Sequence, residues 1–78
     1  MSQASVIKLI LRERKRQDEK WGEQNNEPLR WMAILSEEVG ETNKAILENN
    51  IVDYVEELIQ VAAVAVAALE AVHQGGKT

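Results

Sequence analysis

Residues 37–60 read EEVGETNKAILENNIVDYVEELIQ, and this stretch decides the fold of the chain. Asn49 and Asn50, near its middle, favour the left-handed backbone conformation that ends a helix. Apolar residues recur at helical spacing on both sides of the two asparagines. Asp53 follows them in the first turn of the next segment, where a carboxylate stabilises a helix start. The sequence therefore predicts two helices that fold back on each other in antiparallel directions.

Two acidic clusters lie at equal distances from this turn. Residues equally far from Asn49 meet at the same height in an antiparallel helix pair. Glu41 is then predicted to face Glu57. By the same count, Glu38 faces Gln60. Because residues three apart share one face of a helix, three carboxylates and one amide would gather. Mg²⁺, which takes carboxylate oxygens as ligands, is the natural compensation for such crowded like charges.

The acidic residues also admit a simpler interpretation. Charged residues make up 28% of the chain, and acidic pairs on helices of this kind are commonly solvated surface positions. The register of the second cluster with the first, across the turn, makes a metal site about as well supported as a solvated face.

The chain has 78 residues, no cysteine and a net charge of −4, which together bound its class. This length predicts a single small domain, residues 1–78, that buries a modest share of its surface when alone. The lack of cysteine excludes a disulfide framework and a thiolate metal site, and favours a reducing, cytoplasmic setting. The acidic balance argues against a general nucleic-acid binder. The longest apolar stretch, Val61–Leu69, is about half of a membrane span, and no signal-peptide pattern precedes it, so we expect no membrane association.

Periodicity and helix breakers predict three helices. Their expected extents, in chain order, are Ser2 or Ser5 to Lys20, Pro28 to about Glu48, and about Val52 to His73. Pro28 suits the first turn of a helix, where its missing N–H costs nothing. The segment 22–28 is the one stretch that reads as a loop, and residues 74–78 are expected to be frayed.

The third predicted helix contains a stretch, Val61–Leu69, that is apolar on every face. Such a helix must be covered all round, which two neighbouring helices of one small chain do not readily achieve. Its alanines allow other helices to approach closely. We therefore expect an all-α, three-helix protomer whose helical hairpin pairs with another copy into a four-helix bundle, as a homodimer or a homotetramer.

The spaced motif Glu38-x-x-Glu41, fifteen residues, and then Glu57-x-x-Gln60 resembles the metal site of a known family. The family is the MazG-like group of all-α nucleoside triphosphate pyrophosphohydrolases, whose pattern is Glu-x-x-Glu, a spacer, and Glu-x-x-Asp. Two further segments share the similarity, RQDEKWGEQ at residues 16–24 and EELIQVAAVA at residues 56–65. The resemblance covers roughly residues 12–70.

This resemblance implies that Glu38, Glu41 and Glu57 hold Mg²⁺, or Mn²⁺, against a triphosphate, with Gln60 as the fourth ligand. Glu38 or Glu41 is expected to orient the attacking water. Gln60 stands where the family usually has an aspartate. Its amide oxygen can coordinate Mg²⁺, but it brings no negative charge and cannot act as a general base. Three outcomes are open: three carboxylates suffice, with Glu37 or Glu56 making up the charge; activity is reduced; or the chain binds without hydrolysis.

Trp21, Lys20 and Lys44 are the candidates for contact with the substrate. Trp21 could plug the core beneath the loop, but the resemblance favours an aromatic wall against which a nucleobase stacks. Lys20 ends a basic run that is typical of a solvated helix end, and one or two members of that run are expected to reach the triphosphate across a subunit boundary. The run consists of Arg12, Arg14, Lys15, Arg16 and Lys20. Lys44 follows Glu41 by three residues, so a surface ion pair and a phosphate contact are both open. Trp31 is interpreted as a core or interface residue.

The combined hypothesis is Mg²⁺-dependent hydrolysis of a nucleoside triphosphate, with a deoxynucleotide favoured, to the monophosphate and pyrophosphate. The rival interpretation is a non-catalytic helical interaction module that docks through its alanine–valine helix, or a descendant that only binds nucleotides. A nucleic-acid-binding helix over residues 12–20 is a more distant alternative. The register of the acids discriminates between these classes, because a docking module does not need it.

Overall fold

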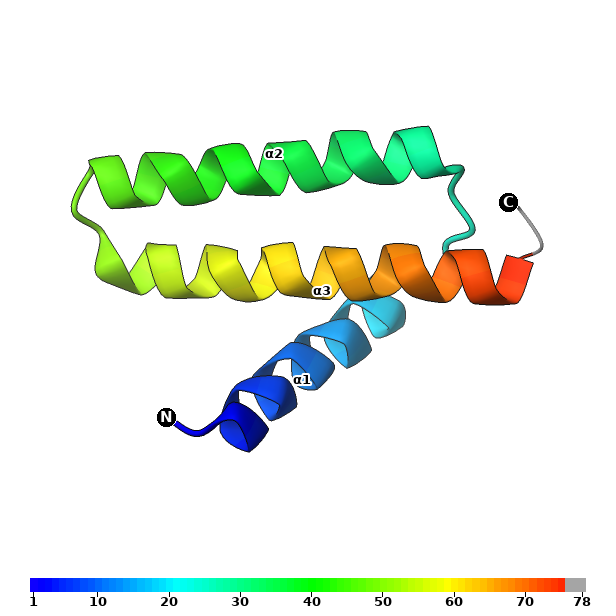
Figure 1. Ribbon diagram of the computed structural model, residues 1–78, viewed down its shortest axis with the longest axis horizontal. Helices are drawn as coiled ribbons and strands as arrows, with labels where there is room; N and C mark the ends of the chain where they lie inside the picture. Colours follow the sequence, from blue (N-terminus) through cyan, green and yellow to red (C-terminus); the bar gives the residue numbers. More distant parts are fainter. Residues whose placement is uncertain (76–78) are drawn as a thin grey trace.

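The computed structural model describes residues 1–75, which form three helices and no strand (Figure 1). The helices are α1 (Gln3–Trp21), α2 (Pro28–Leu47) and α3 (Ile51–Gly75). The predicted all-α class and helix order are confirmed, and α3 continues beyond the expected end at His73. Residues 76–78 of the predicted frayed tail lie outside the described residues.

The turn between α2 and α3 is built by its two asparagines. Asn49 adopts the predicted left-handed conformation, with φ of 57°. Its N–H donates to the carbonyl of Ile46 at 3.2 Å. The N–H of Asn50 donates to the carbonyl of Ala45 at 2.9 Å, which completes the Schellman pattern of a helix end. Asn50 also starts α3, because its side-chain oxygen accepts the N–H of Asp53 at 3.1 Å. Two adjacent caps thus fix the register of the hairpin.

The small core of the protein lies between α2 and α3, which run side by side in antiparallel directions (Figure 1). Its buried members are Trp31 from α2 and Val64, Ala67 and Ala71 from α3. The alanines let the two helices approach, and the indole of Trp31 fills the space that they leave. Trp31 is 6% exposed, which confirms its predicted place in the core.

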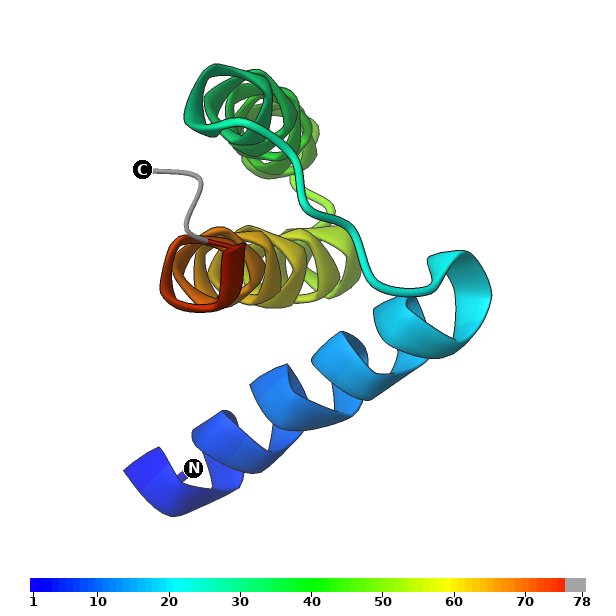
Figure 2. The ribbon, with the colours of Figure 1, turned by 90° about the vertical axis from the view of Figure 1, so that its right-hand side faces the viewer.

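α1 crosses the side of α3 that lies away from α2, so that α3 is the middle helix (Figure 2). Ser2 caps its start by accepting the N–H of Ser5 at 3.2 Å. Gly22 follows its last residue with φ of 73° and ψ of −173°, a backbone region that is essentially restricted to glycine. This glycine directs the chain into the loop that leads to Pro28 and α2.

α3 presents three faces, two of which are covered. α1 and α2 together bury Ala63, Val64 and Ala67, which belong to the stretch that the sequence predicted to need cover on all sides. The third face is apolar and partly open to solvent: five of its residues, from Ile51 to Val72, are between 41% and 61% exposed, and its two alanines are of intermediate exposure. This face, here called the α3 seam, follows a heptad spacing through Ile51, Val55, Leu58, Ala62, Ala65, Leu69 and Val72. Within residues 1–75 no helix is both long and apolar enough to cross a membrane.

Candidate functional site

Three glutamates meet where α2 faces α3, and we call them the acid cluster. Glu38 and Glu41 come from successive turns of α2, and Glu57 comes from α3. One carboxylate oxygen of each residue lies within 4.8 Å of those of the other two. The structure thus brings together the three carboxylates that the turn register predicted to meet. Their role as metal ligands stays a prediction.

The carboxyl groups of the acid cluster crowd one another without a compensating cation. Burial, hydrogen bonding to the carboxyl groups of Glu41 and Glu38, and the negative charge of both raise the pKa of Glu57 to about 7. Burial also raises the pKa of Glu38, together with the charges of Glu41 and Glu37. Oε2 of Glu57 is buried and has no hydrogen-bond partner. In the described part of the chain, no lysine or arginine forms an ion pair with the cluster.

This set of donors suits a hard divalent cation. Mg²⁺ binds through one or two carboxylates and keeps positions for water and phosphate oxygens. A cation here would offset the repulsion that raises the pKa of Glu57 and would give its buried Oε2 a partner. Glu41 is exposed, so the cluster is accessible from solvent. The residues present therefore fit the Mg²⁺ that the sequence motif implies.

Gln60, the fourth residue of the motif, is held by α1. Its Oε1 accepts a hydrogen bond from Nε2 of Gln17 at 3.1 Å. Its Nε2 donates to Oε2 of Glu13 at 2.8 Å. Gln60 lines the same cavity as Glu38, in keeping with the predicted register. Both ends of its amide are nevertheless directed to α1, a connection that the spacing of the motif does not predict.

A network of charged and amide side chains, here called the clasp, joins α1 to α3. Its members are Glu13, Arg14, Gln17 and Asp18 of α1 with Gln60 and Glu70 of α3. The guanidinium of Arg14 donates to Glu70 through two nitrogens, and the Arg14 side chain is only 12% exposed. Although burial opposes the shift, the carboxylates of Glu70 and Asp18 raise the pKa of Arg14. These contacts make Arg14 a structural residue.

Glu13 is enclosed in the clasp and is fully satisfied. Both of its oxygens accept from Arg16, at 2.9 and 2.7 Å, and one also accepts from Gln60. The hydrogen bond from Arg16, opposed in part by burial and aided by Gln60, lowers the pKa of Glu13. The sequence predicts a solvated helix end for the basic run that contains Arg14 and Arg16, whereas the structure encloses the side chains of Arg14 and Glu13. One feature of the sequence points to the contact between Arg14 and Glu70. Glu70 is a charged residue that directly follows an apolar stretch, which indicates an arginine partner.

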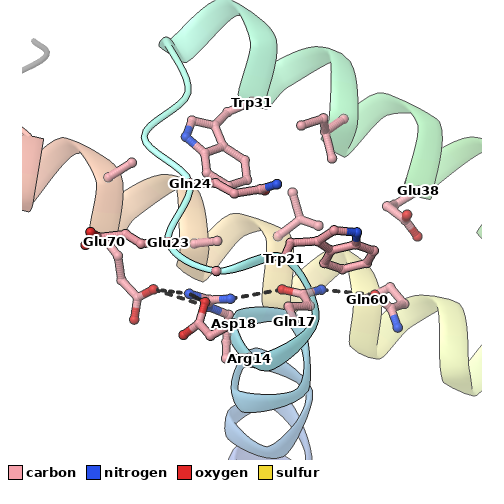
Figure 3. Close-up of a pocket in the computed structure, with 15 residues that line it drawn as sticks. Arg14, Gln17, Asp18, Trp21, Glu23, Gln24, Trp31, Glu38, Gln60 and Glu70 are labelled. Carbon is pink, nitrogen blue, oxygen red and sulfur yellow. Dashed lines mark hydrogen bonds and ion pairs between the residues drawn. The ribbon is translucent and has the colours of Figure 1, made fainter.

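A cavity of about 450 Å³ opens between the end of α1, the following loop, α2 and α3. In Figure 3, Trp21, Glu38 and Gln60 lie toward one end of it, and Arg14 and Glu70 lie toward the other. Its apolar lining comes from Trp31, Ile34, Val64, Ala67 and Ala71. A cavity of this size accommodates a small-molecule ligand. Glu38 belongs both to this cavity and to the acid cluster, so the two features are continuous.

Trp21 is the last residue of α1 and forms part of the cavity wall. Its side chain is 53% exposed, so it does not plug the core beneath the loop, which was one of the two expectations. The ammonium of Lys20 lies over the indole, 4.7 Å from the ring centroid. The structure therefore places two of the predicted substrate residues against each other, with Trp21 in the cavity wall and Lys20 next to the wall but outside the cavity lining.

Lys44 lies apart from these two residues. It belongs to the last turn of α2, it is exposed, and it does not line the cavity. The surface ion pair with Glu41 that the spacing allowed is not formed among residues 1–75. Lys44 follows Glu41 by about one turn of α2, and its contact with phosphate stays a prediction.

Comparison of the chain with family models, with curated proteins and with solved structures found no match. The resemblance to the MazG-like family therefore rests on the motif residues themselves.

Proposed function

We propose that this protein is a Mg²⁺-dependent nucleoside triphosphate pyrophosphohydrolase of the MazG-like family, releasing a nucleoside monophosphate and pyrophosphate. The observation that carries the proposal is the position of the acid cluster. Three carboxylates without a cationic partner meet at the edge of a cavity of about 450 Å³. Glu38 belongs to both, so a triphosphate held at the cluster would extend its nucleoside into the cavity.

The chain supplies charge and proton acceptors for this reaction. When bound, Mg²⁺ would neutralise the phosphate oxygens and position them for in-line attack. Glu38, Glu41 and Glu57 provide its oxygen ligands. Water attacks the α-phosphorus, the bond from that phosphorus to the bridging α–β oxygen breaks, and pyrophosphate leaves. Glu38 or Glu41 orients the water and accepts its proton.

The nucleoside end of the substrate is assigned to the wall that Trp21 forms. Its half-exposed ring offers a flat surface to a base at the cavity. Stacking of a base on an aromatic side chain stabilises binding by about 1–3 kcal/mol. Lys20 adds a positive charge over one face of the ring, where it can meet a phosphate. The preference for a deoxynucleotide follows from the resemblance.

A second copy of the chain is the proposed cover for the α3 seam. The seam repeats apolar residues at the spacing that helices use to pair along a common axis. On α2, exposed Met32, Val39 and Ile46 recur every seven residues and supply a second apolar stripe. Two hairpins that pair through such stripes form the expected four-helix bundle, as a dimer or a tetramer.

The oligomer is tested with one substitution in the seam and one outside it. Leu69→Glu places a charge in the seam and is expected to give monomers in multi-angle light scattering. Leu11→Glu is the matched control, because Leu11 is 57% exposed, lies on α1 and belongs to neither stripe. A wild-type chain that is monomeric at micromolar concentration contradicts the bundle.

The same exposed apolar face favours the second candidate function, a helical interaction module whose acids merely solvate the hairpin. The two functions differ in their response to metal. A ligand that binds only the folded state raises the melting temperature, so Mg²⁺ or Mn²⁺ stabilises the enzyme and leaves a pure docking module unchanged. Pyrophosphate release from a panel of ribo- and deoxynucleoside triphosphates then identifies the base.

Trp21 allows a separate test of the nucleoside wall. Trp21→Ala is expected to weaken nucleotide binding about tenfold, in line with the loss of one stacking contact, while Mg²⁺ affinity is unchanged. Trp21→Phe is the control, since it keeps an aromatic face. Loss of folding in Trp21→Ala, or equal binding by all three proteins, would remove Trp21 from the site.

A further inference from the structure

Gln60 has an environment that differs from that of the three glutamates beside it. Its Oε1 accepts from Gln17 and its Nε2 donates to Glu13, so both of its polar atoms are engaged by α1. The acid cluster, by contrast, retains a buried oxygen on Glu57 that has no partner. The amide of Gln60 is therefore satisfied within the chain, as expected of a structural group.

The direction of these hydrogen bonds is determined by charge. The carboxylate of Glu13 can only accept, so the amide nitrogen of Gln60 must face it. Oε1 of Gln17 accepts from Nη1 of Arg14 at 3.0 Å, so Nε2 of Gln17 is the end that donates to Gln60. One directed chain of donors thus runs from Arg14 to Glu13. Each group in the chain is oriented by its neighbour, which strengthens the network.

A carboxylate at position 60 would not fit this network. It could still accept from Gln17, but it would set a second negative group against the enclosed carboxylate of Glu13. Two such carboxylates repel and leave one interaction without a donor. The glutamine, which replaces the aspartate usual in the resembling motif, is the residue type that α1 requires here.

We propose that Gln60 is a positioning residue, which docks α1 onto α3 and thereby holds Trp21 at the cavity, in place of serving as the fourth metal ligand. α1 packs on α3 and not on α2, so its placement depends on contacts such as this one. Gln17 precedes Trp21 by one helical turn, and both residues line the cavity. Figure 3 shows Gln17 bonded to Gln60 beneath the indole of Trp21. The link therefore lies between the acid cluster and the aromatic wall.

Hydrogen exchange of the full chain tests the docking role. Gln60→Glu keeps an acceptor for Gln17 but loses the donor to Glu13, and we expect amide exchange in α1 to rise about tenfold with α2 and α3 little changed. Combining Gln60→Glu with Glu13→Gln conserves the local charge and restores a donor facing an acceptor. The combined variant is expected to return α1 to within about threefold of wild-type exchange. Gln24→Glu, an exposed cavity residue outside the clasp, is the control for added charge.

The catalytic consequence of this inference rests on the proposed function and has its own measurement. A displaced Trp21 wall weakens substrate binding, so Gln60→Glu should raise KM for a deoxynucleoside triphosphate about tenfold while kcat falls less than about threefold. The combined variant should recover KM. If Gln60 were a metal ligand instead, Gln60→Glu would tighten Mg²⁺ binding, α1 exchange would stay at the wild-type level, and the second substitution would restore nothing.

The two proposals fail in different ways. If neither Mg²⁺ binding nor hydrolysis is found in the wild type, the proposed function is lost, and the exchange result still decides whether Gln60 docks α1. If Gln60→Glu does not fold but the combined variant does, the docking role is supported. Unchanged α1 exchange in Gln60→Glu, or failure of the combined variant to restore it, overturns the inference.

Discussion

The acid cluster and the clasp are neighbours on α3, and they differ in whether their carboxylates have hydrogen-bond donors as partners. Glu57 belongs to the first and Gln60, one turn later, belongs to the second. In the clasp, every carboxylate has an arginine or an amide as donor. In the acid cluster, the neighbours of each carboxyl group are further carboxyl groups. The difference separates a network whose charges are paired within the chain from a cluster whose negative charges have no cationic partner among the described residues.

Glu13 and Glu57 show the consequence most directly. Both are glutamates that are largely covered by neighbouring helices. The hydrogen bond from Arg16 leads the causes that lower the pKa of Glu13, whereas burial and two carboxyl neighbours raise that of Glu57 to about 7. Burial alone would raise the pKa of both glutamates. The pKa of Glu13 is lowered instead because Arg16 and Gln60 donate hydrogen bonds to its carboxylate. Strongly shifted groups without a compensating partner tend to mark functional sites.

The largest expected effect comes from removing one charge from the acid cluster. Glu57→Gln should reduce pyrophosphate release at least about a hundredfold, because a ligand of the proposed cation is lost. The same substitution should stabilise the metal-free protein by about 1 kcal/mol at pH 8, since it relieves repulsion in a partly buried site. Turnover and urea unfolding, each with and without Mg²⁺, measure the two effects.

Glu56→Gln is the matched control for this experiment. Glu56 is an exposed glutamate next in sequence to Glu57 and outside the acid cluster. It should leave turnover and stability close to those of the wild type. Equal behaviour of the two variants would mean that Glu57 is an ordinary solvated acid, and the contrast between cluster and clasp would lose its functional meaning.

A substitution in the clasp should affect structure first. Arg14→Gln removes the donors to Glu70 and Asp18, and we expect a loss of about 1–3 kcal/mol in unfolding free energy, typical of an enclosed charged group left without its partner. The loss should appear as faster hydrogen exchange in α1 than in α2 and α3. Mg²⁺ should stabilise this variant as much as it stabilises the wild type.

Arg12→Gln serves as the control, because Arg12 is exposed and forms no ion pair among the described residues. It removes the same charge from the same helix without touching the clasp. If Arg12→Gln and Arg14→Gln destabilise the protein equally, net charge and not the clasp is responsible. If Arg14→Gln abolishes the Mg²⁺ effect, the two regions are not separable.

The sequence predicted the acid cluster better than it predicted the clasp. Local signals sufficed for the cluster: Asn49 and Asn50 fix the turn, and counting outward from it brings Glu41 to Glu57. The clasp joins residues separated by 43 to 56 positions, and the angle at which α1 crosses α3 is not encoded in helical periodicity. The exposure of Trp21 depends on that same crossing, so it too required the structure.

The smallest expected effect, and the one that compares the two regions in a single experiment, is the dependence of metal-free stability on pH. For Glu57, the folded-state pKa of about 7 exceeds the ordinary value of 4.5, so the folded protein binds more protons between these values. Its contribution therefore lowers the unfolding free energy as pH rises through that window, by about 1 kcal/mol after allowance for solvent screening. Glu13 has the opposite effect. Because its pKa is lowered in the folded state, it adds to the unfolding free energy above pH 4.5, and this stabilisation is lost in more acidic solution.

Urea unfolding from pH 3 to 8 resolves the two contributions. Glu57→Gln should flatten the decline between about pH 4.5 and 7, and Glu13→Gln should reduce the loss on the acidic side while leaving that decline in place. Added Mg²⁺ should reverse the decline, because a cation binds the deprotonated cluster and its stabilisation grows as Glu57 loses its proton. A decline that survives in Glu57→Gln would show that other groups govern it. A Mg²⁺ effect of equal size at pH 5 and pH 8 would place the ion away from Glu57, and the cluster would then be a strained surface and not a site.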